Sequence, residues 1–270
     1  MQKSHFRLVQ QAGLLLGFIG AFLPCARAAD LASQHLHPGP ASNWRFTLQP
    51  YFLPPTINGD TTVGRLPNVN INVGANDILQ NLRFGIMFHA EALYKSKVGV
   101  GYDLAYMNIG RAADQVLPQG RLRASMGQLI MEVFGFVRVF DTPQFSADLL
   151  AGGRYWDNGL KFEVSGSLFG DFQIKPQESW VDPFIGGRVA FNATEQIVIL
   201  ARADIGGFDV SSSIAWLLQG GLGYTFNDSW QATLEYKALS VDFHNDRSGQ
   251  SEYSYDTITH GPLVSVAFSF

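Results

Sequence analysis

The sequence predicts an all-β fold, an up-and-down antiparallel transmembrane β-barrel of about ten strands that follows a cleaved signal peptide. Three observations predict it. The amino terminus has the layout of a secretory signal. The rest of the chain consists largely of segments in which apolar positions recur at every second residue. Within those segments the charged residues fall on one parity only.

The amino terminus resembles a secretory signal in three successive parts. Lys3 and Arg7 precede an apolar run from Ala12 to Pro24, and Ala26-Arg27-Ala28 supplies the small residues of a cleavage site. The apolar run is shorter than the roughly 18 residues that a membrane-spanning helix needs. We therefore expect a signal peptide over residues 1–28, a periplasmic tether over 29–42 and the barrel over 43–270.

Charge and cysteine content narrow the function classes. Removal of Lys3, Arg7 and Arg27 with the signal leaves 16 basic against 23 acidic residues, a net charge of −7. An acidic chain does not neutralise phosphates, so we expect no nucleic-acid partner. Cys25, the only cysteine, lies within the signal, so no disulfide is expected in the mature protein. We also expect no metal and no cofactor, because the His35-x-His37 pair has no evident third ligand.

Period-two alternation locates the strands. The segment 84–94 shows it clearly, because Phe84, Ile86, Phe88, Ala90, Ala92 and Tyr94 alternate with a second face that carries His89 and Glu91. The ten expected strands are 43–53, 83–94, 98–109, 125–140, 145–156, 179–191, 196–206, 213–226, 229–240 and 257–270. Short turns alternate with mostly longer connectors, as in outer-membrane barrels, which places both termini on the periplasmic side.

The strand number leaves two alternatives, eight and twelve. Residues 61–63 and 69–73 in the first long connector alternate as well, and they predict a small hairpin outside the membrane or, if they cross it, a total of twelve strands. Residues 76–82 between them and the next strand predict a single helical turn capped by Asn76 or Asp77.

The charged residues of the strands share one face. The opposite parity carries no charge in the membrane portions, and a Lys or Arg facing lipid at mid-membrane would cost about 2–4 kcal/mol. We therefore assign the charged parity to the lumen. Its basic members are Arg45, Arg83, Arg138, Arg154, Arg188, Arg202 and Lys237, and its acidic members are Glu91, Asp103, Glu132, Asp148, Asp182, Asp204 and Glu235.

Three further features support this choice of faces. The uncharged parity carries aromatic residues near the short turns, typical of an interfacial girdle: Trp44, Tyr94, Phe145, Phe191, Phe226, Trp230 and Phe270. Glycines gather on the charged parity, as at Gly99, Gly101, Gly152 and Gly186, where they let a narrow barrel curve. The last strand is apolar at Phe268 and Phe270, and it resembles the carboxy-terminal signal that the outer-membrane assembly machinery recognises.

Several stretches resemble a group of Gram-negative outer-membrane β-barrel proteins, most of which have no assigned activity. These are Pro50–Pro54 with Asn58–Asp60, Asp77–Leu82, Trp180–Pro183 with Gly186 and Arg188, Asp204–Phe208, and Gln219–Gly221 with Tyr224. The resemblance implies the barrel fold and the outer-membrane location, and it implies no catalytic residue. The expected partners are outer-membrane lipid, lipopolysaccharide and the assembly machinery, and we expect a monomer.

The lumen residues lead to the expected function. Ten strands enclose a narrow interior, and equal numbers of acidic and basic residues neutralise each other there, for example Glu132 with Arg154 and Asp182 with Arg202. We expect a salt-bridged, largely plugged lumen, a structural or surface-interaction role, and no enzymatic activity.

Two alternatives remain open. One is a narrow channel for small solutes or ions, in which His89 beside Glu91 titrates as a gate. The other is a hydrolase at the external rim that uses the last loop. Its candidate residues are Asp242, His244 and Asp246, with the hydroxyls of Ser248 and Ser251.

Overall fold

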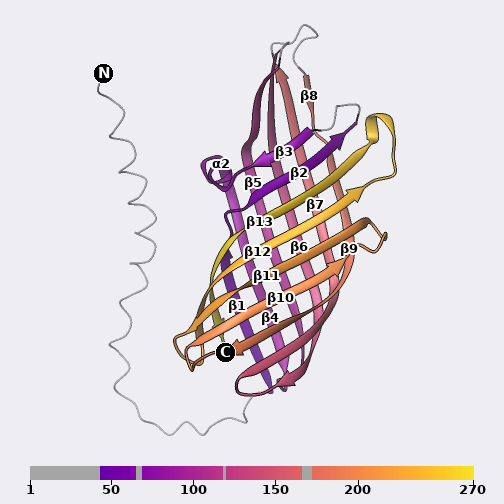
Figure 1. Cartoon of the computed structure of the whole chain (residues 1–270). Coiled ribbons are helices and arrows are strands. Elements are labelled where there is room, and N and C mark those ends of the chain that lie inside the picture. The colour runs from indigo at the N-terminus through magenta and orange to yellow at the C-terminus, as the bar shows by residue number, and fades with distance from the viewer. Residues whose placement is uncertain (1–42, 65–68, 118–119, 166–171) are drawn as a thin grey trace, which may run out of the picture. The chain divides into compact units, whose positions relative to one another are not determined.

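The computed structural model describes residues 43–64, 69–117, 120–165 and 172–270, which form a single closed barrel (Figure 1). Its strands are β1 (Trp44–Phe52), β4 (Leu82–Tyr94), β5 (Val98–Leu117), β6 (Gly120–Asp141), β7 (Phe145–Ser165), β9 (Gln177–Asn192), β10 (Ile197–Gly206), β11 (Ser212–Thr225), β12 (Trp230–His244) and β13 (Tyr253–Ser269). Each pairs antiparallel with the next, and β1 pairs with β13 to close the ring. The predicted ten-stranded up-and-down barrel is confirmed. The predicted signal peptide and tether lie outside the described residues.

The two ends of the barrel differ. At one end, here the turn end, short turns follow β4, β6, β9 and β11, as predicted from the sequence. Lys95 and Ser96 both have positive φ (49° and 54°), which suits the type I′ turn of a tight hairpin. At the other end, here the loop end, the strands are longer than predicted, and β7 continues to Ser165 instead of ending near residue 156.

A small hairpin extends the wall at the loop end. β2 (Thr56–Val63) pairs with β3 (Val69–Val73) and with the loop-side part of β13, so this hairpin adds no crossing to the ring of ten. The helix α2 (Ala75–Asn81) follows, and its N-cap is Gly74, without a side-chain cap, so the predicted cap at Asn76 or Asp77 is wrong. A short strand, β8 (Phe172–Ile174), pairs with β7, and a 3-10 turn, η2, covers Gly249–Ser251.

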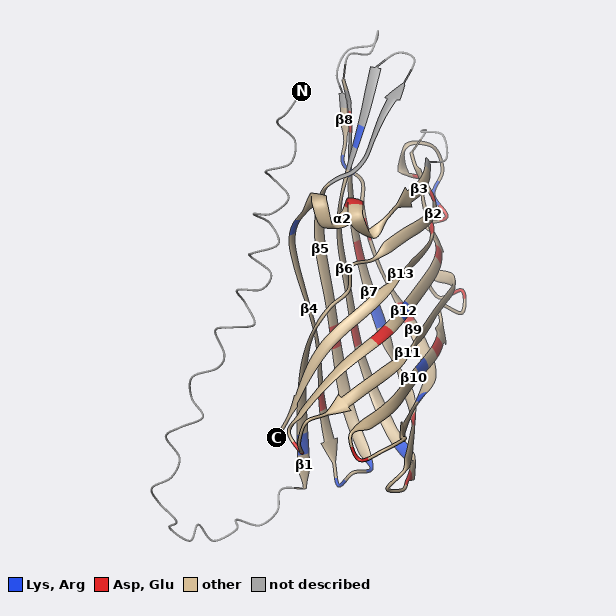
Figure 2. Ribbon diagram, turned by 60° about the vertical axis from the view of Figure 1, so that its left-hand side comes forward, with Lys and Arg blue, Asp and Glu red and all other residues tan. Residues whose placement is uncertain are grey.

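The outward face of the wall is apolar. Half or more of Val100, Val133, Ile185, Leu222 and Leu234 is exposed, which is the arrangement of side chains that face lipid. At the turn end this face carries exposed Trp44, Phe191, Phe226, Trp230 and Phe270. Figure 2 shows that charged residues occupy isolated segments of the strands and positions near the two ends, and that most of the ribbon carries none. No helix among the described residues is long and apolar enough to cross a bilayer.

Candidate functional site

The centre of the lumen holds two arginines and two carboxylates that alternate around a four-membered ring of contacts. Arg154 Nε donates to Glu132 Oε1 at 2.9 Å, and Arg154 Nη2 donates to Asp204 Oδ1 at 2.8 Å. Arg202 Nη2 donates to the other oxygens of the same two carboxylates, at 2.7 Å and 2.8 Å. Arg154, Glu132 and Asp204 are fully buried, so each charge depends on its partners for stabilisation.

Aromatic rings surround this central ring of charges. The Arg154 guanidinium lies 4.9 Å from the centre of the Phe184 ring, and the Arg202 guanidinium lies 5.1 Å from the centre of the Phe134 ring. Such stacking orients a guanidinium and adds cation–π attraction. The neighbouring strands make room for these rings, because Gly101 and Gly152 stand where a Cβ would collide with Phe134.

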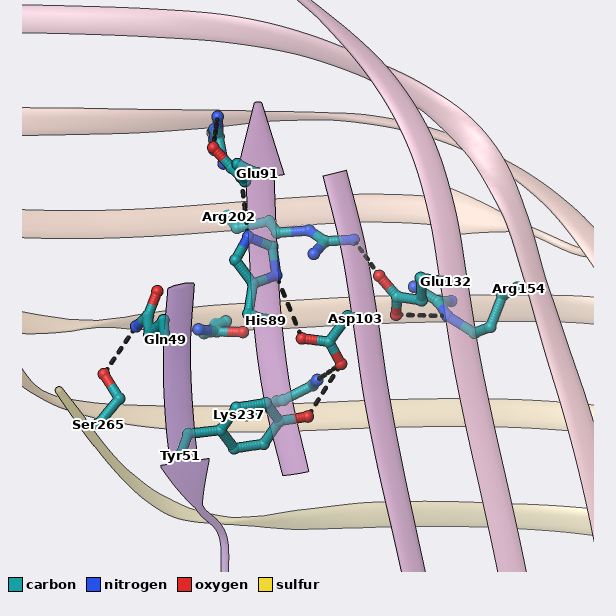
Figure 3. A network of polar contacts seen from close by, with 12 residues as sticks. Gln49, Tyr51, His89, Glu91, Asp103, Glu132, Arg154, Arg202, Lys237 and Ser265 are labelled. Atoms are coloured by element: carbon teal, nitrogen blue, oxygen red, sulfur yellow. Dashed lines mark hydrogen bonds and ion pairs between the residues drawn. The ribbon is translucent and has the colours of Figure 1, made fainter. Parts of the chain in front are cut away.

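A second polar cluster adjoins the first on the side of β1, β4 and β5 (Figure 3). His89 lies between two carboxylates, with its Nε2 2.8 Å from Glu91 and its Nδ1 3.3 Å from Asp103. Asp103 also accepts a hydrogen bond of 2.9 Å from the Tyr51 hydroxyl, and the Lys237 ammonium lies 3.8 Å away. Every carboxylate of this cluster therefore faces at least one donor.

Nearer the turn end, Arg188 joins the two sides of the lumen. It binds Glu91 through both terminal nitrogens, and its Nε donates to Asp148 at 2.8 Å. Arg138 binds the same aspartate at 2.8 Å. Glu235 accepts from Gln219 at 2.9 Å and from Thr233 at 2.8 Å.

The polar side chains enclose a cavity of about 310 Å³ in the turn-side half of the lumen. Its lining combines charges of both signs with amide and hydroxyl groups. The charged members are Glu91, Asp103, Arg138, Asp148, Arg188, Arg202, Glu235 and Lys237, and His89 also lines the cavity. This part of the lumen is a polar, charge-balanced chamber.

The loop-side half of the lumen is filled. Trp156 and Trp180 stack with ring centres 5.7 Å apart, and Phe243 stacks on Trp180 at 3.9 Å. We call the buried apolar cluster around this stack the loop-side plug. It comprises Ile57, Val63, Val73, Ile78, Met107, Ile109, Met126, Ile130, Trp156, Leu160, Trp180, Ala215, Leu217, Leu239, Val241, Phe243, Tyr253 and Tyr255.

The structure separates three of the predicted lumen residues from this network. Arg45 is exposed at the turn end beside Leu93. Arg83 is exposed next to Gly110, because a β-bulge between Leu82 and Phe84 interrupts the alternation that had assigned it to the lumen. Asp182 is buried in the lumen, but it does not pair with Arg202.

Asp182 is instead held by three neutral donors. Ser212 donates to it through its backbone N–H at 2.9 Å and its hydroxyl at 2.7 Å, and Trp180 Nε1 donates at 3.1 Å. The predicted pair with Arg202 is wrong because Arg202 lies opposite Arg188 in the register of β9 and β10, closer to the turn end than Asp182. The predicted pair of Glu132 with Arg154 is present.

Sequence reasoning did not single out Tyr51, Trp180, Ser212, Gln219 and Thr233, which complete these contacts. Three of them, Tyr51, Trp180 and Thr233, have the same parity as the charged residues of their own strands. Gln219 lies on β11, which carries no charge, and Ser212 stands at an irregularity where β11 begins. A search of the charged parity for all hydrogen-bonding side chains, not only charged ones, would have found the three.

The predicted rim cluster is open to solvent. His244 Nε2 lies 3.3 Å from Asp246, and the two side chains are 56% and 90% exposed. Among the described residues, no serine hydroxyl forms a hydrogen bond with His244. Phe208, Asp209 and Asp246 have positive φ, so the loop-end turns have tight local geometry. No cluster of three or more His, Cys, Asp or Glu in the described part of the chain is arranged to hold a metal ion.

Comparison with solved structures identifies the fold. The outer membrane protease OmpT of Escherichia coli matches with a TM-score of 0.57 and 9% sequence identity, over 85% of this chain and 98% of its own. The translocator domain of autotransporter NalP from Neisseria meningitidis (TM-score 0.43, 12% identity, 97% and 96% covered) and the Ail protein of Yersinia pestis (0.36, 10%, 85% and 99%) match more loosely. Neither a protein-family model nor a curated protein sequence matches the chain. The chain therefore has the fold of an outer-membrane β-barrel protein.

Proposed function

We propose that the protein is an integral component of a Gram-negative outer membrane, with a closed lumen and a structural or surface-interaction role. The observation that carries this proposal is the loop-side plug, a buried apolar cluster inside the barrel in which Trp180 stacks on both Trp156 and Phe243. An ion on the barrel axis would have to leave water to cross this apolar layer, which is costly. The central ring of charges lies beneath it, and the side chains of Arg154, Glu132 and Asp204 are fully buried there.

The loop end offers a surface on which a partner can bind. A cleft of about 610 Å³ lies between residues 174–178 and the last loop. Lys175, Glu178, Arg247 and Glu252 line it, so it carries both charges. Arg247 and Asn245 both donate to Glu178, at 2.9 Å and 3.1 Å, which ties the last loop to β9. These contacts support a surface-interaction role for the loop end.

Two measurements on one refolded sample test the closed barrel. Heat-dependent gel mobility reports whether a barrel has formed, and single-channel recording in lipopolysaccharide-containing bilayers reports whether it conducts. We expect a mobility shift without conductance steps. A mobility shift with discrete steps would refute the closed lumen, and the absence of both a shift and insertion would refute the membrane assignment.

The proposed orientation places the turn end in the periplasm. Single cysteines introduced as Ser248→Cys in the last loop and Lys95→Cys in a turn test it in intact cells. A membrane-impermeant maleimide should label the first and spare the second until the cells are broken. Labelling of the second variant alone would show the opposite orientation.

The alternative of a narrow channel is supported by the polar cavity of about 310 Å³. It requires the loop-side plug to move, so the same recording decides it. The alternative of a rim hydrolase rests on His244 with Asp246. Comparison of wild type with His244→Ala on a panel of lipid and peptide substrates tests it, and we expect no activity that depends on His244.

A further inference from the structure

The wall of the barrel changes its pairing partners on the loop side of Pro50. On the turn side, β1 and β4 pair from Trp44 opposite Tyr94 as far as Pro50 opposite Phe88. Among the described strands, the rest of β4, residues 82–87, pairs with β5 only. β13 likewise exchanges β1 for β2. Proline has no N–H to donate, and Pro54 and Pro55 lead the chain from β1 into β2.

The wall therefore contains a seam between the end of β1 and the free part of β4. The helix α2 lies against β5 and β2 (Figure 1), and its Ile78 and Leu79 line the space at the seam together with residues of β1 and β4, so the helix shields the seam. Such coverage matters because unpaired backbone at membrane depth is tolerated where protein shields it or where it lines a cavity.

The cover leaves an apolar cavity of about 60 Å³, which we call the seam cleft. This exceeds the roughly 10–15 Å³ that one water molecule needs, and an apolar cavity of this kind stays dry. The residues that line it include Phe52, Leu53, Leu79, Leu82, Met87 and Met107. The seam cleft thus has room for the terminal part of a hydrocarbon chain.

The seam cleft connects the outside of the wall to the inside. On its outer side Phe52 and Leu79 are 50% and 43% exposed, and they continue the apolar surface of Phe84 and Ile86. On its inner side, Met107 is 5% exposed and belongs to the loop-side plug. A lipid-facing surface is therefore continuous with the interior of the barrel at this point.

Tyr51 forms the boundary between the seam cleft and the polar cavity, because its side chain lines both. Its hydroxyl donates to Asp103, and Lys237 lies 5.7 Å from the centre of its ring. The ring thus presents an apolar surface toward the cleft, and its polar end belongs to the charged network.

We propose that the seam cleft is a lateral binding site for a hydrocarbon chain of the surrounding lipid. This rests on the proposed membrane placement of the barrel. The occupant follows from continuity, since the same apolar side chains that face lipid line the entrance, and close packing against the chain supplies the attraction. The loop-side plug blocks the axis of the barrel, so the seam is the route by which an apolar molecule reaches the lumen.

Photolabelling of the full-length barrel tests this site. The protein is reconstituted in phosphatidylcholine vesicles that contain a phosphatidylcholine with a diazirine near the methyl end of one acyl chain. After irradiation, labelled residues are mapped by mass spectrometry. We expect label on inward-facing Met87 and Met107 as well as on lipid-facing Val133 and Leu222. Leu217 and Leu239, which are buried in the plug away from the cleft, should stay unlabelled.

Gly85→Leu should close the seam cleft. A Cβ at Gly85 would lie 3.5 Å from the Tyr106 carbonyl and 3.7 Å from a Leu82 methyl, so a side chain is tolerated there and extends into the cleft. We expect at least a fivefold loss of label at Met107 with unchanged label at Val133. Gly85→Ala, which adds only the Cβ, is the matched control and should keep the label.

The outcomes separate the two proposals. Label on Val133 and Leu222 without label on Met87 and Met107 would refute the lateral site and leave the membrane placement intact. No label on any lipid-facing residue would refute the membrane placement. Label on Met107 that persists in folded Gly85→Leu would refute entry through the seam. Heat-dependent mobility reports folding, and if Gly85→Leu does not fold, the wild-type labelling pattern decides.

Discussion

The two halves of the lumen share nine of the ten strands of the ring, with β2 in place of β1 at the loop end, yet they are filled by different physical means. The turn-side half holds paired charges around a chamber of about 310 Å³. The loop-side half holds a packed stack of Trp156, Trp180 and Phe243. Complementary charges stabilise the turn-side half, and close packing with dispersion attraction stabilises the loop-side half. A barrel lumen therefore does not need one chemistry throughout.

This difference changes what each half tolerates. A buried ion-pair network suffers when one partner is removed, because an uncompensated charge remains. A packed core suffers when volume is removed, because a cavity remains. A substitution that removes a charge from the turn-side half and one that removes volume from the loop-side half should therefore destabilise the barrel by different mechanisms, and the two effects can be told apart.

Arg154→Ala should have the largest effect on stability. It leaves Glu132 and Asp204 buried with only Arg202 between them, and breaking such a network costs roughly 3–5 kcal/mol. Urea-induced unfolding in lipid vesicles measures the change. Arg247→Ala, which removes an exposed ion pair with Glu178 at the rim, is the control and should cost at most about 1 kcal/mol. Equal costs for the two variants would mean that the network is readily hydrated.

Trp180→Ala should cost about 3 kcal/mol, at the low end for loss of a buried aromatic side chain, because water from the loop end can enter the space. It also removes the indole that stacks on Phe243, so conductance steps should appear in planar bilayers if the plug is the barrier. Trp216→Ala, on the outward parity of β11, should give no conductance. A silent Trp180→Ala barrel that is folded would assign the barrier to the central ring of charges instead.

The two halves also differed in how well the sequence predicts them. Charged residues are excluded from the lipid face, so their parity identified the lumen side of most strands. The loop-side plug escaped prediction because the contrast between the two faces reverses at the loop end: inward residues there are apolar and several outward neighbours are charged, as in Trp156-Asp157 and Val241-Asp242. A search for charged residues on the lumen face therefore passes over the plug. The strand ends were underestimated for the same reason, since beyond the membrane lipid no longer constrains the outward positions.

The parity of a residue predicts which face of the strand it occupies, but not its height along the barrel axis. Asp182 and Arg202 share a face, but their strands are staggered so that Arg202 meets Arg188. Register follows from turn geometry and packing across the whole ring, which a single strand does not contain. Arg83 failed for a local reason, since one bulged residue reverses the assignment of its side chain.

Tyr51→Phe is a smaller change at the boundary between the polar cavity and the seam cleft. It deletes the hydroxyl that donates to Asp103 and keeps the ring that faces the seam cleft. Asp103 keeps His89 and Lys237, so we expect a cost of about 1–2 kcal/mol by urea unfolding. Tyr224→Phe on the lipid face is the matched control and should be near neutral. A cost above that of Trp180→Ala would show that this hydroxyl organises the whole second cluster.

The smallest effect is expected outside the lumen, above the apolar band. Asp256 of β13 lies between Asp242 of β12 and Asp60 of β2 on the outer face of the loop end. Partial burial raises the pKa of Asp256, and the neighbouring carboxylates raise it further. Asp256 therefore binds its proton more tightly in the folded than in the unfolded state, so the protein loses stability as the pH rises from about 4, the ordinary pKa, through the raised value.

Asp256→Asn removes this penalty. We expect it to stabilise the barrel at pH 7.5 by less than about 1 kcal/mol, since the side chain is exposed, and to have no effect at a pH well below about 4, where the carboxylates are protonated in both states. Urea unfolding with a chelator, which removes divalent cations, measures both values, with Asp228→Asn in a turn as the control. Destabilisation by Asp256→Asn at pH 7.5 would show that the carboxylate is stabilised by its surroundings despite its two acidic neighbours, and that charge outside the lumen follows the same pairing rule as charge within it.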